Sequence, residues 1–295
     1  MSTTTLRRLA TAIATLAATT ALAGCAGTTP TEPAPAPPAG SMNAEHGGHG
    51  MESTGGMSMP SGTGLADTVN GYTLALRTPP AAGQSGATFA ITKDGAPVTA
   101  FDPEQTKLMH FYLIRSDLTG FQHLHPEMSP DGTWTAPTAA VGPGDYRAYV
   151  QFVPHADAAA GALILSTPLT VQGAASPAAA LPAATSSTVV DGYQVALTGA
   201  PKAGVAGPLT ITITRDGRPV TDLQPYLDTY AHVTAIHQGD LAFAHLHPEG
   251  TVAGDRGGPS LTLHAELPSA GNYRMFVQFQ TGGTLHTAPI TVAAS

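Results

Sequence analysis

The sequence has a single cysteine, Cys25, among its 295 residues. One cysteine excludes a disulfide within the chain, a paired-thiol redox centre and a zinc cage built from thiolates. Charged residues are also scarce, at 11%, and acidic residues outnumber Lys and Arg by 20 to 12. Proteins that bind nucleic acid need basic surface, so this balance argues against a nucleic-acid partner. The 33 glycines and 26 prolines disfavour long helices and favour short strands joined by turns.

The first 24 residues predict a lipoprotein signal peptide. Arg7 and Arg8 precede an apolar run over residues 9–24, which is too short for a comfortable transmembrane helix. The run ends in Leu-Ala-Gly-Cys at 22–25, which resembles a bacterial lipobox, where the cysteine receives lipid such as palmitate. We therefore expect an extracytoplasmic protein anchored to the cell membrane through Cys25. An ordinary signal peptide with an incidental cysteine is the alternative.

Residues 25–66 predict a disordered tether, because their Pro, Gly, Met and His content cannot bury a core. Thioether and imidazole groups suit copper ions, and methionine has no solubility role in a solvated linker. The tether's candidate auxiliary metal ligands are Met42, His46, His49, Met51, Met57 and Met59. Compositional drift in a low-complexity segment would explain the same residues.

The remainder of the chain consists of two tandem repeats of one domain. Phe-Gln-His-Leu-His-Pro-Glu at 121–127 recurs as Phe-Ala-His-Leu-His-Pro-Glu at 243–249, and Val-Gln-Phe at 150–152 recurs at 277–279. The predicted domains are residues 67–172 and 188–295, separated by a linker over 173–187.

Each repeat predicts an all-β fold, an immunoglobulin-like or cupredoxin-like β-sandwich. The candidate strands are short, end at Gly, Pro or Asp, and have the spacing of a sandwich. In the first repeat they span residues 71–77, 87–93, 107–115, 121–125, 133–137, 145–153 and 163–171. Asp-Gly at 94–95 and 216–217 predicts tight hairpins. Tyr146, in Pro-Gly-Asp-Tyr, resembles the tyrosine corner of immunoglobulin-like sandwiches.

The histidines form two constellations with the same spacing. His110, His123 and His125 in the first repeat match His232, His245 and His247 in the second. Histidines two residues apart on a strand point to the same face. A turn near residue 117 places His110 opposite His123 or His125, and either register puts all three on one face. Histidines kept by duplication alone would be the alternative.

Three imidazoles on a rigid sheet predict a metal site in each repeat, suited to Cu(II) or Zn(II). The general order of affinities favours copper over zinc. No cysteine remains for a blue-copper centre. Glu127 and Glu249 are candidate acceptors for an imidazole N–H, because metal-binding histidines usually donate their other nitrogen.

The segments Leu-Met-His-Phe-Tyr-Leu-Ile at 108–114, Phe-Gln-His-Leu-His-Pro at 121–126 and Pro-Gly-Asp-Tyr at 143–146 resemble a group of bacterial extracytoplasmic β-sandwich domains of the YtkA-like, cupredoxin-like type. The resemblance covers both repeats. It implies a β-sandwich fold and a role in handling copper or other heavy metals.

Together these patterns predict a lipid-anchored copper-binding protein rather than an enzyme, acting as a chaperone, buffer or resistance component. Its partners would be the membrane, the metal ion and an envelope protein that accepts or exports copper. One alternative is an immunoglobulin-like interaction module that binds no metal. Another is a copper enzyme such as a Cu,Zn superoxide dismutase, although no second set of ligands for a bimetal site stands out.

Overall fold

The structure is a computed structural model that describes residues 63–295, apart from residues 247, 248 and 251 and the side chain of His245. The described residues fall within one unit of the chain. Their regular structure is almost entirely β-strand, which confirms the all-β prediction. A 3-10 helix, η1 (His155–Ala160), is the one helix among these residues.

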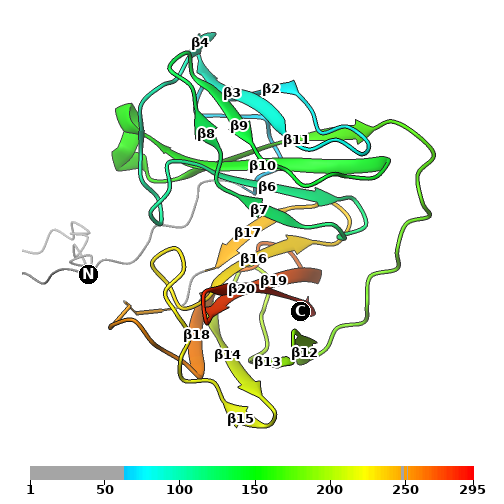
Figure 1. Cartoon of the computed structure of the whole chain (residues 1–295), viewed down its shortest axis with the longest axis vertical. Coiled ribbons are helices and arrows are strands. Elements are labelled where there is room, and N and C mark those ends of the chain that lie inside the picture. Colours follow the sequence, from blue (N-terminus) through cyan, green and yellow to red (C-terminus); the bar gives the residue numbers. More distant parts are fainter. Residues whose placement is uncertain (1–62, 247–248, 251) are drawn as a thin grey trace, which may run out of the picture. The chain divides into compact units, whose positions relative to one another are not determined.

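The first repeat is built from two antiparallel sheets (Figure 1). One sheet has the order β1-β2-β3-β9-β8, with β4 paired to β3. Its strands are β1 (Thr68–Val69), β2 (Tyr72–Thr78), β3 (Ala87–Lys93), β4 (Ala96–Pro97), β8 (Glu127–Met128) and β9 (Thr133–Ala136). The other sheet has the order β11-β10-β6-β7, with β5 paired to β10. Its strands are β5 (Phe101–Asp102), β6 (His110–Arg115), β7 (Gln122–Leu124), β10 (Gly144–Pro154) and β11 (Leu163–Val171).

The second repeat has a similar arrangement, in which no described strand corresponds to β5 or β8. One sheet has the order β12-β13-β14-β15, with β18 paired to β14. Its strands are β12 (Ser187–Val190), β13 (Tyr193–Thr198), β14 (Gly207–Arg215), β15 (Arg218–Pro219) and β18 (Ser260–Ala265). The other sheet, β17-β16-β19-β20, consists of β16 (His232–His237), β17 (Phe243–Leu246), β19 (Gly271–Thr281) and β20 (Thr284–Ala294).

Each sandwich has its own apolar core, to which alternate residues of the long strands contribute. In β10, Tyr146, Ala148, Val150 and Phe152 all point into the core of the first repeat, as a strand's period of two requires. The Tyr146 hydroxyl donates to the carbonyl of Gly142 over 3.0 Å, which confirms the predicted tyrosine corner.

A third apolar cluster joins the two repeats. We call it the inter-repeat core, and its buried members are Tyr112, Ile114, Leu118, Tyr149, Ile164, Ile236, Phe243 and Phe276. The sequence repeat supplies equivalent residues from both sides, such as Ile114 with Ile236. The cluster buries the outer face of the β6–β7 sheet, which a lone sandwich would expose to water.

The end of the predicted tether lies against this interface. The carbonyl of Thr63 accepts a hydrogen bond from the Phe243 backbone N–H over 2.8 Å, and the carbonyl of Ala66 accepts one from Ser166 over 2.8 Å. Packing therefore extends before residue 67, the expected start of the first sandwich, to at least Thr63.

Candidate metal centre

His110, His123 and His125 lie on one face of the sheet formed by β6 and β7. In this antiparallel pair Tyr112 opposes His123 and Phe111 opposes Leu124, so the same register carries His125 opposite His110. Phe111 points to the opposite face, into the core of the first sandwich. The structure thus has the shared face that the spacing predicts, and His125 lies just beyond the end of β7.

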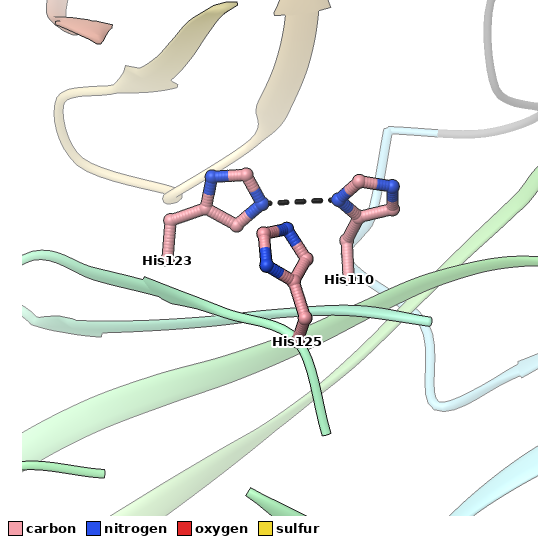
Figure 2. Close-up of side chains that lie close together, drawn as sticks. All are labelled: His110, His123 and His125. Carbon is pink, nitrogen blue, oxygen red and sulfur yellow. Dashed lines mark hydrogen bonds between the residues drawn. The ribbon is translucent and has the colours of Figure 1, made fainter. Parts of the chain in front are cut away.

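The three imidazoles converge (Figure 2). One nitrogen from each ring lies within 4.8 Å of the other two. The ring centroid of His110 lies 5.3 Å from that of His123 and 5.1 Å from that of His125. A three-histidine group of this kind could hold a metal ion.

Hydrogen bonds fix which nitrogen of two of these rings carries the proton. His110 Nε2–H donates to the backbone carbonyl of Glu104 over 3.0 Å, and His123 Nδ1–H donates to Oε1 of Gln278 over 2.7 Å. A carbonyl oxygen only accepts, so the ring nitrogen facing it must be the donor. A neutral imidazole has one N–H, so the other nitrogen of each ring holds a lone pair.

These two remaining nitrogens face one another. His110 Nδ1 and His123 Nε2 are 3.0 Å apart, the contact drawn as a dashed line in Figure 2. With both rings neutral there is no proton between them, and two lone pairs at this distance repel. A cation between the two nitrogens would turn that repulsion into attraction. Two nitrogens bound at 2.0–2.1 Å to a tetrahedral ion would lie about 3.3 Å apart, close to the separation seen.

His125 supplies a third nitrogen. Its Nε2 is buried and has no hydrogen-bond partner among the described residues. A buried polar atom without a partner costs free energy, of order 1–3 kcal/mol, unless a ligand satisfies it. The donor set therefore fits a transition-metal ion that accepts imidazole nitrogen.

Burial keeps the three rings neutral. The pKa of His110 falls from 6.5 to about 4, chiefly through burial and in small part through Lys107, while the Glu104 carbonyl opposes the shift. Burial, with the neighbouring His110 and Lys107, lowers the pKa of His125 to about 3. The pKa of His123 falls well below its usual value, chiefly through burial and then through the two other histidines. Neutral imidazole is the form that binds metal.

The second repeat covers this site. The ring of His232 stacks on that of His123, with centroids 4.6 Å apart and planes 23° apart. The Tyr112 hydroxyl lies 3.4 Å from His232 Nε2, and both residues are fully buried. The histidine spacing predicts one site in each repeat but contains no sign that the second repeat packs on the site of the first.

An open cavity of about 780 Å³ reaches His123. Both repeats line it, with Phe121, Leu124 and Pro137 from the first and Gln278 and Leu285 from the second. No Lys, Arg, Asp or Glu lines this cavity among the described residues. It offers a route from solvent to the edge of the histidine cluster.

The histidines of the second repeat are described in part. His232 begins β16 and is fully buried, as His110 is in β6. The backbone of His245 opposes Thr234, the register in which His123 opposes Tyr112. The side chain of His245 and the whole of His247 lie outside the described residues, as do Cys25 and the tether's Met42, His46, His49, Met51, Met57 and Met59.

Glu127 is not the acceptor for His110 or His123, contrary to its predicted role, whereas the role of Glu249 depends on His245 and His247 and stays a prediction. Glu127 is exposed in β8, and the carboxylate of Glu249 lies 3.4 Å from His264 Nδ1. The acceptors in the first repeat are instead the Glu104 carbonyl and Gln278. A backbone carbonyl leaves no mark in a sequence, whereas the glutamine stands in a Val-Gln-Phe segment that both repeats contain.

No helix in the described part of the chain is long and apolar enough to cross a membrane. Among curated proteins no match was found.

Comparison with solved structures gives matches of low sequence identity and low TM-score. Fibronectin(III)-like modules of Clostridium thermocellum CbhA are 13% identical, with 75% of this chain and 93% of that chain covered and a TM-score of 0.20. Domains 4 and 5 of the S-layer protein SbsC are 12% identical, with 75% and 96% covered and a TM-score of 0.22. The family model described as "Domain of unknown function (DUF8832)" matches residues 67–167 and 187–295, one match for each sandwich, and the chain therefore belongs to this family.

Proposed function

We propose that this protein binds a transition-metal ion, copper in preference to zinc, through His110, His123 and His125. The observation that carries the proposal is the 3.0 Å approach of two nitrogens whose rings both donate elsewhere. Beside them lies the buried Nε2 of His125, for which the described residues offer no hydrogen-bond partner. Three neutral donors directed at one point are arranged as metal ligands, and a cation between them would turn the repulsion of facing lone pairs into attraction.

Copper is favoured over zinc by the donor set. Divalent ions bind nitrogen ligands in an order that rises to Cu(II) and falls again at Zn(II). The predicted tether also contains Met and His residues. Its methionines add thioether groups, which suit Cu(I) and have little affinity for zinc. Zinc remains the alternative ion, since metal supply can override the order of affinities.

A second site in the second repeat completes the proposal. The sequence repeats the three-histidine spacing at His232, His245 and His247. The buried position of His232 and the backbone register of His245 support this assignment. We therefore propose one ion per repeat and two per chain.

The N-terminal sequence supports a proposal for the cellular role. Lipid on Cys25 would hold the protein at the outer face of the cell membrane. We propose capture, buffering or delivery of copper in the envelope, with an envelope protein that accepts or exports copper as partner. The resemblance to YtkA-like, cupredoxin-like domains agrees with binding rather than catalysis.

Metal stoichiometry tests the proposal. The purified full chain is dialysed against Cu(II), Cu(I) under reducing conditions, or Zn(II), and the bound metal is counted. We expect about one ion per repeat, and the double variant His123→Ala/His125→Ala should lose one equivalent. The variant His155→Ala/His264→Ala is the matched control, because it removes two exposed histidines. A His123→Ala/His125→Ala variant that still binds the wild-type amount would contradict the proposal.

A further inference from the structure

The ring of His123 is held by a residue that belongs to the other repeat. Gln278, in β19, accepts the His123 Nδ1–H bond over 2.7 Å and is 3% exposed. Gln278 pairs directly with His232, which lies on the neighbouring strand β16. Its amide nitrogen lies 3.4 Å from Oγ1 of Thr287, which orients the amide oxygen toward His123.

We propose that Gln278 of the second repeat is a positioning residue for the metal site of the first repeat, so that this site is complete only while the two repeats are packed together. The inference rests on the proposed function and adds a condition to it. With Gln278 in this role, the first metal site requires both repeats. The second repeat then does more than add a second metal site.

The physical reason lies in the two tautomers of imidazole. His123 must carry its proton on Nδ1 if Nε2 is to bind the ion beside His110. Gln278 stabilises that tautomer and sets the orientation of the ring. Metal-binding histidines usually have such an acceptor, and its loss typically lowers metal affinity about 10–100-fold.

The second repeat also contacts the His123 ring directly. His232 stacks on one side of His123, with centroids 4.6 Å apart, and Tyr112 of the first repeat stacks at 4.3 Å. Separation of the repeats would remove both Gln278 and His232 from His123. Metal binding and repeat packing are therefore linked, and an ion that binds only the packed form stabilises the packing.

The test uses the full chain with Cu(II) and a competing chelator. Gln278→Leu removes the acceptor while keeping a similar volume, and we expect the affinity for one bound ion to fall about 10–100-fold. Gln278→Glu keeps an acceptor oxygen and should restore at least the wild-type affinity. Gln238→Leu is the matched control, because Gln238 is exposed and bonds Asn272 instead. Nitrogen-15 spectra of the metal-free protein should show the Nδ1–H tautomer of His123 in the wild type and its partial loss in Gln278→Leu.

The outcomes separate the two proposals. A wild-type chain that binds no ion would overturn the proposed function and, with it, this inference. A wild-type chain that binds, with Gln278→Leu equally tight and His123 in the same tautomer, would overturn the inference alone. Equal loss in Gln278→Leu and Gln278→Glu would assign Gln278 a packing role only, and would also overturn it.

Discussion

Phe121 of the first repeat and Phe276 of the second stack on each other, with ring centroids 4.0 Å apart and planes 5° apart. Phe243, the counterpart of Phe121 in the second repeat, packs against Tyr149 at 5.3 Å. Each repeat thus packs an aromatic residue, which lies just before its His-Leu-His segment, against the histidine-bearing sheet of the other repeat. The face that carries the histidines is for this reason an internal surface.

Truncating one of these rings should weaken the packing of the repeats. Phe276 is 5% exposed, and a buried Phe→Ala change typically costs about 3–5 kcal/mol. We expect Phe276→Ala to lower the free energy of unfolding by about 3 kcal/mol. Denaturant titration of the metal-free chain measures this. Leu285→Ala is the control, since Leu285 is 39% exposed, and its effect should be clearly smaller. Equal effects would mean that the inter-repeat core contributes little.

Acid should destabilise the metal-free protein before it protonates the buried histidines. The unfolded chain takes up protons near pH 6.5, whereas burial holds the pKa of His110 at about 4 and that of His125 at about 3. Between these values the unfolded state binds more protons, so stability falls as the pH drops from about 6.5 toward 4. Each histidine that stays neutral contributes up to about 1.4 kcal/mol per pH unit.

Denaturant titrations at a series of pH values check this sign. The variant His123→Ala/His125→Ala should show a shallower fall in stability across the same window. Gln238→Leu should keep the wild-type slope, because Gln238 is exposed and has no ionisable group. A wild-type stability that is flat or rises on acidification would be inconsistent with neutral, buried imidazoles.

Lys107 opposes a cation at the site. Its positive charge lowers the pKa of both His110 and His125, and the same field acts on a bound metal ion. Because Lys107 is exposed, water and salt screen the effect to below about 1 kcal/mol. We expect Lys107→Gln to tighten metal binding about two- to fivefold at low salt, and less at high salt. Chelator competition measures it, with Lys202→Gln as control. Weaker binding in Lys107→Gln would reverse the predicted sign.

Gly64 tests the contact between the end of the tether and the interface. It has a φ of +64°, and an added Cβ would lie 3.0 Å from Cβ of Phe243 and 3.2 Å from Cγ1 of Ile164. Gly95 has a φ of +80° with open space around it. Gly95→Ala should therefore lower the free energy of unfolding only through the unfavourable backbone conformation. That cost is about 1–2 kcal/mol. Gly64→Ala should cost more by thermal or denaturant unfolding, and an equal cost would place residue 64 away from Phe243.

The positions of strands and the shared histidine face were predictable because they depend on local patterns. Alternation in β10 defined the core face, and Asp-Gly at 94–95 joins β3 to β4 as a two-residue hairpin. A turn near residue 117 was enough to put His110, His123 and His125 on one side. The register, in which His123 opposes Tyr112, agrees with that turn.

The covering of that face was not predictable in the same way. The outer face of the sheet is apolar and includes Tyr112, Ile114 and Phe121. An apolar outer face on an antiparallel sheet indicates that something covers it, but it does not identify the partner. Contacts between the repeats join residues 155 positions apart, as in the bond from His123 to Gln278. Spacing along one hairpin contains no information about such a pair.

The most direct test of the central claim is X-ray absorption at the copper edge of the full chain loaded with one equivalent of Cu(II). We expect about three imidazole nitrogens at about 2.0 Å from the ion and no sulfur. In His123→Ala/His125→Ala, His110 alone remains of the first-repeat ligands, so a three-imidazole spectrum of that variant would come from the second repeat. A wild-type spectrum dominated by sulfur, or by oxygen without imidazole, would contradict the assignment of the metal to this histidine cluster.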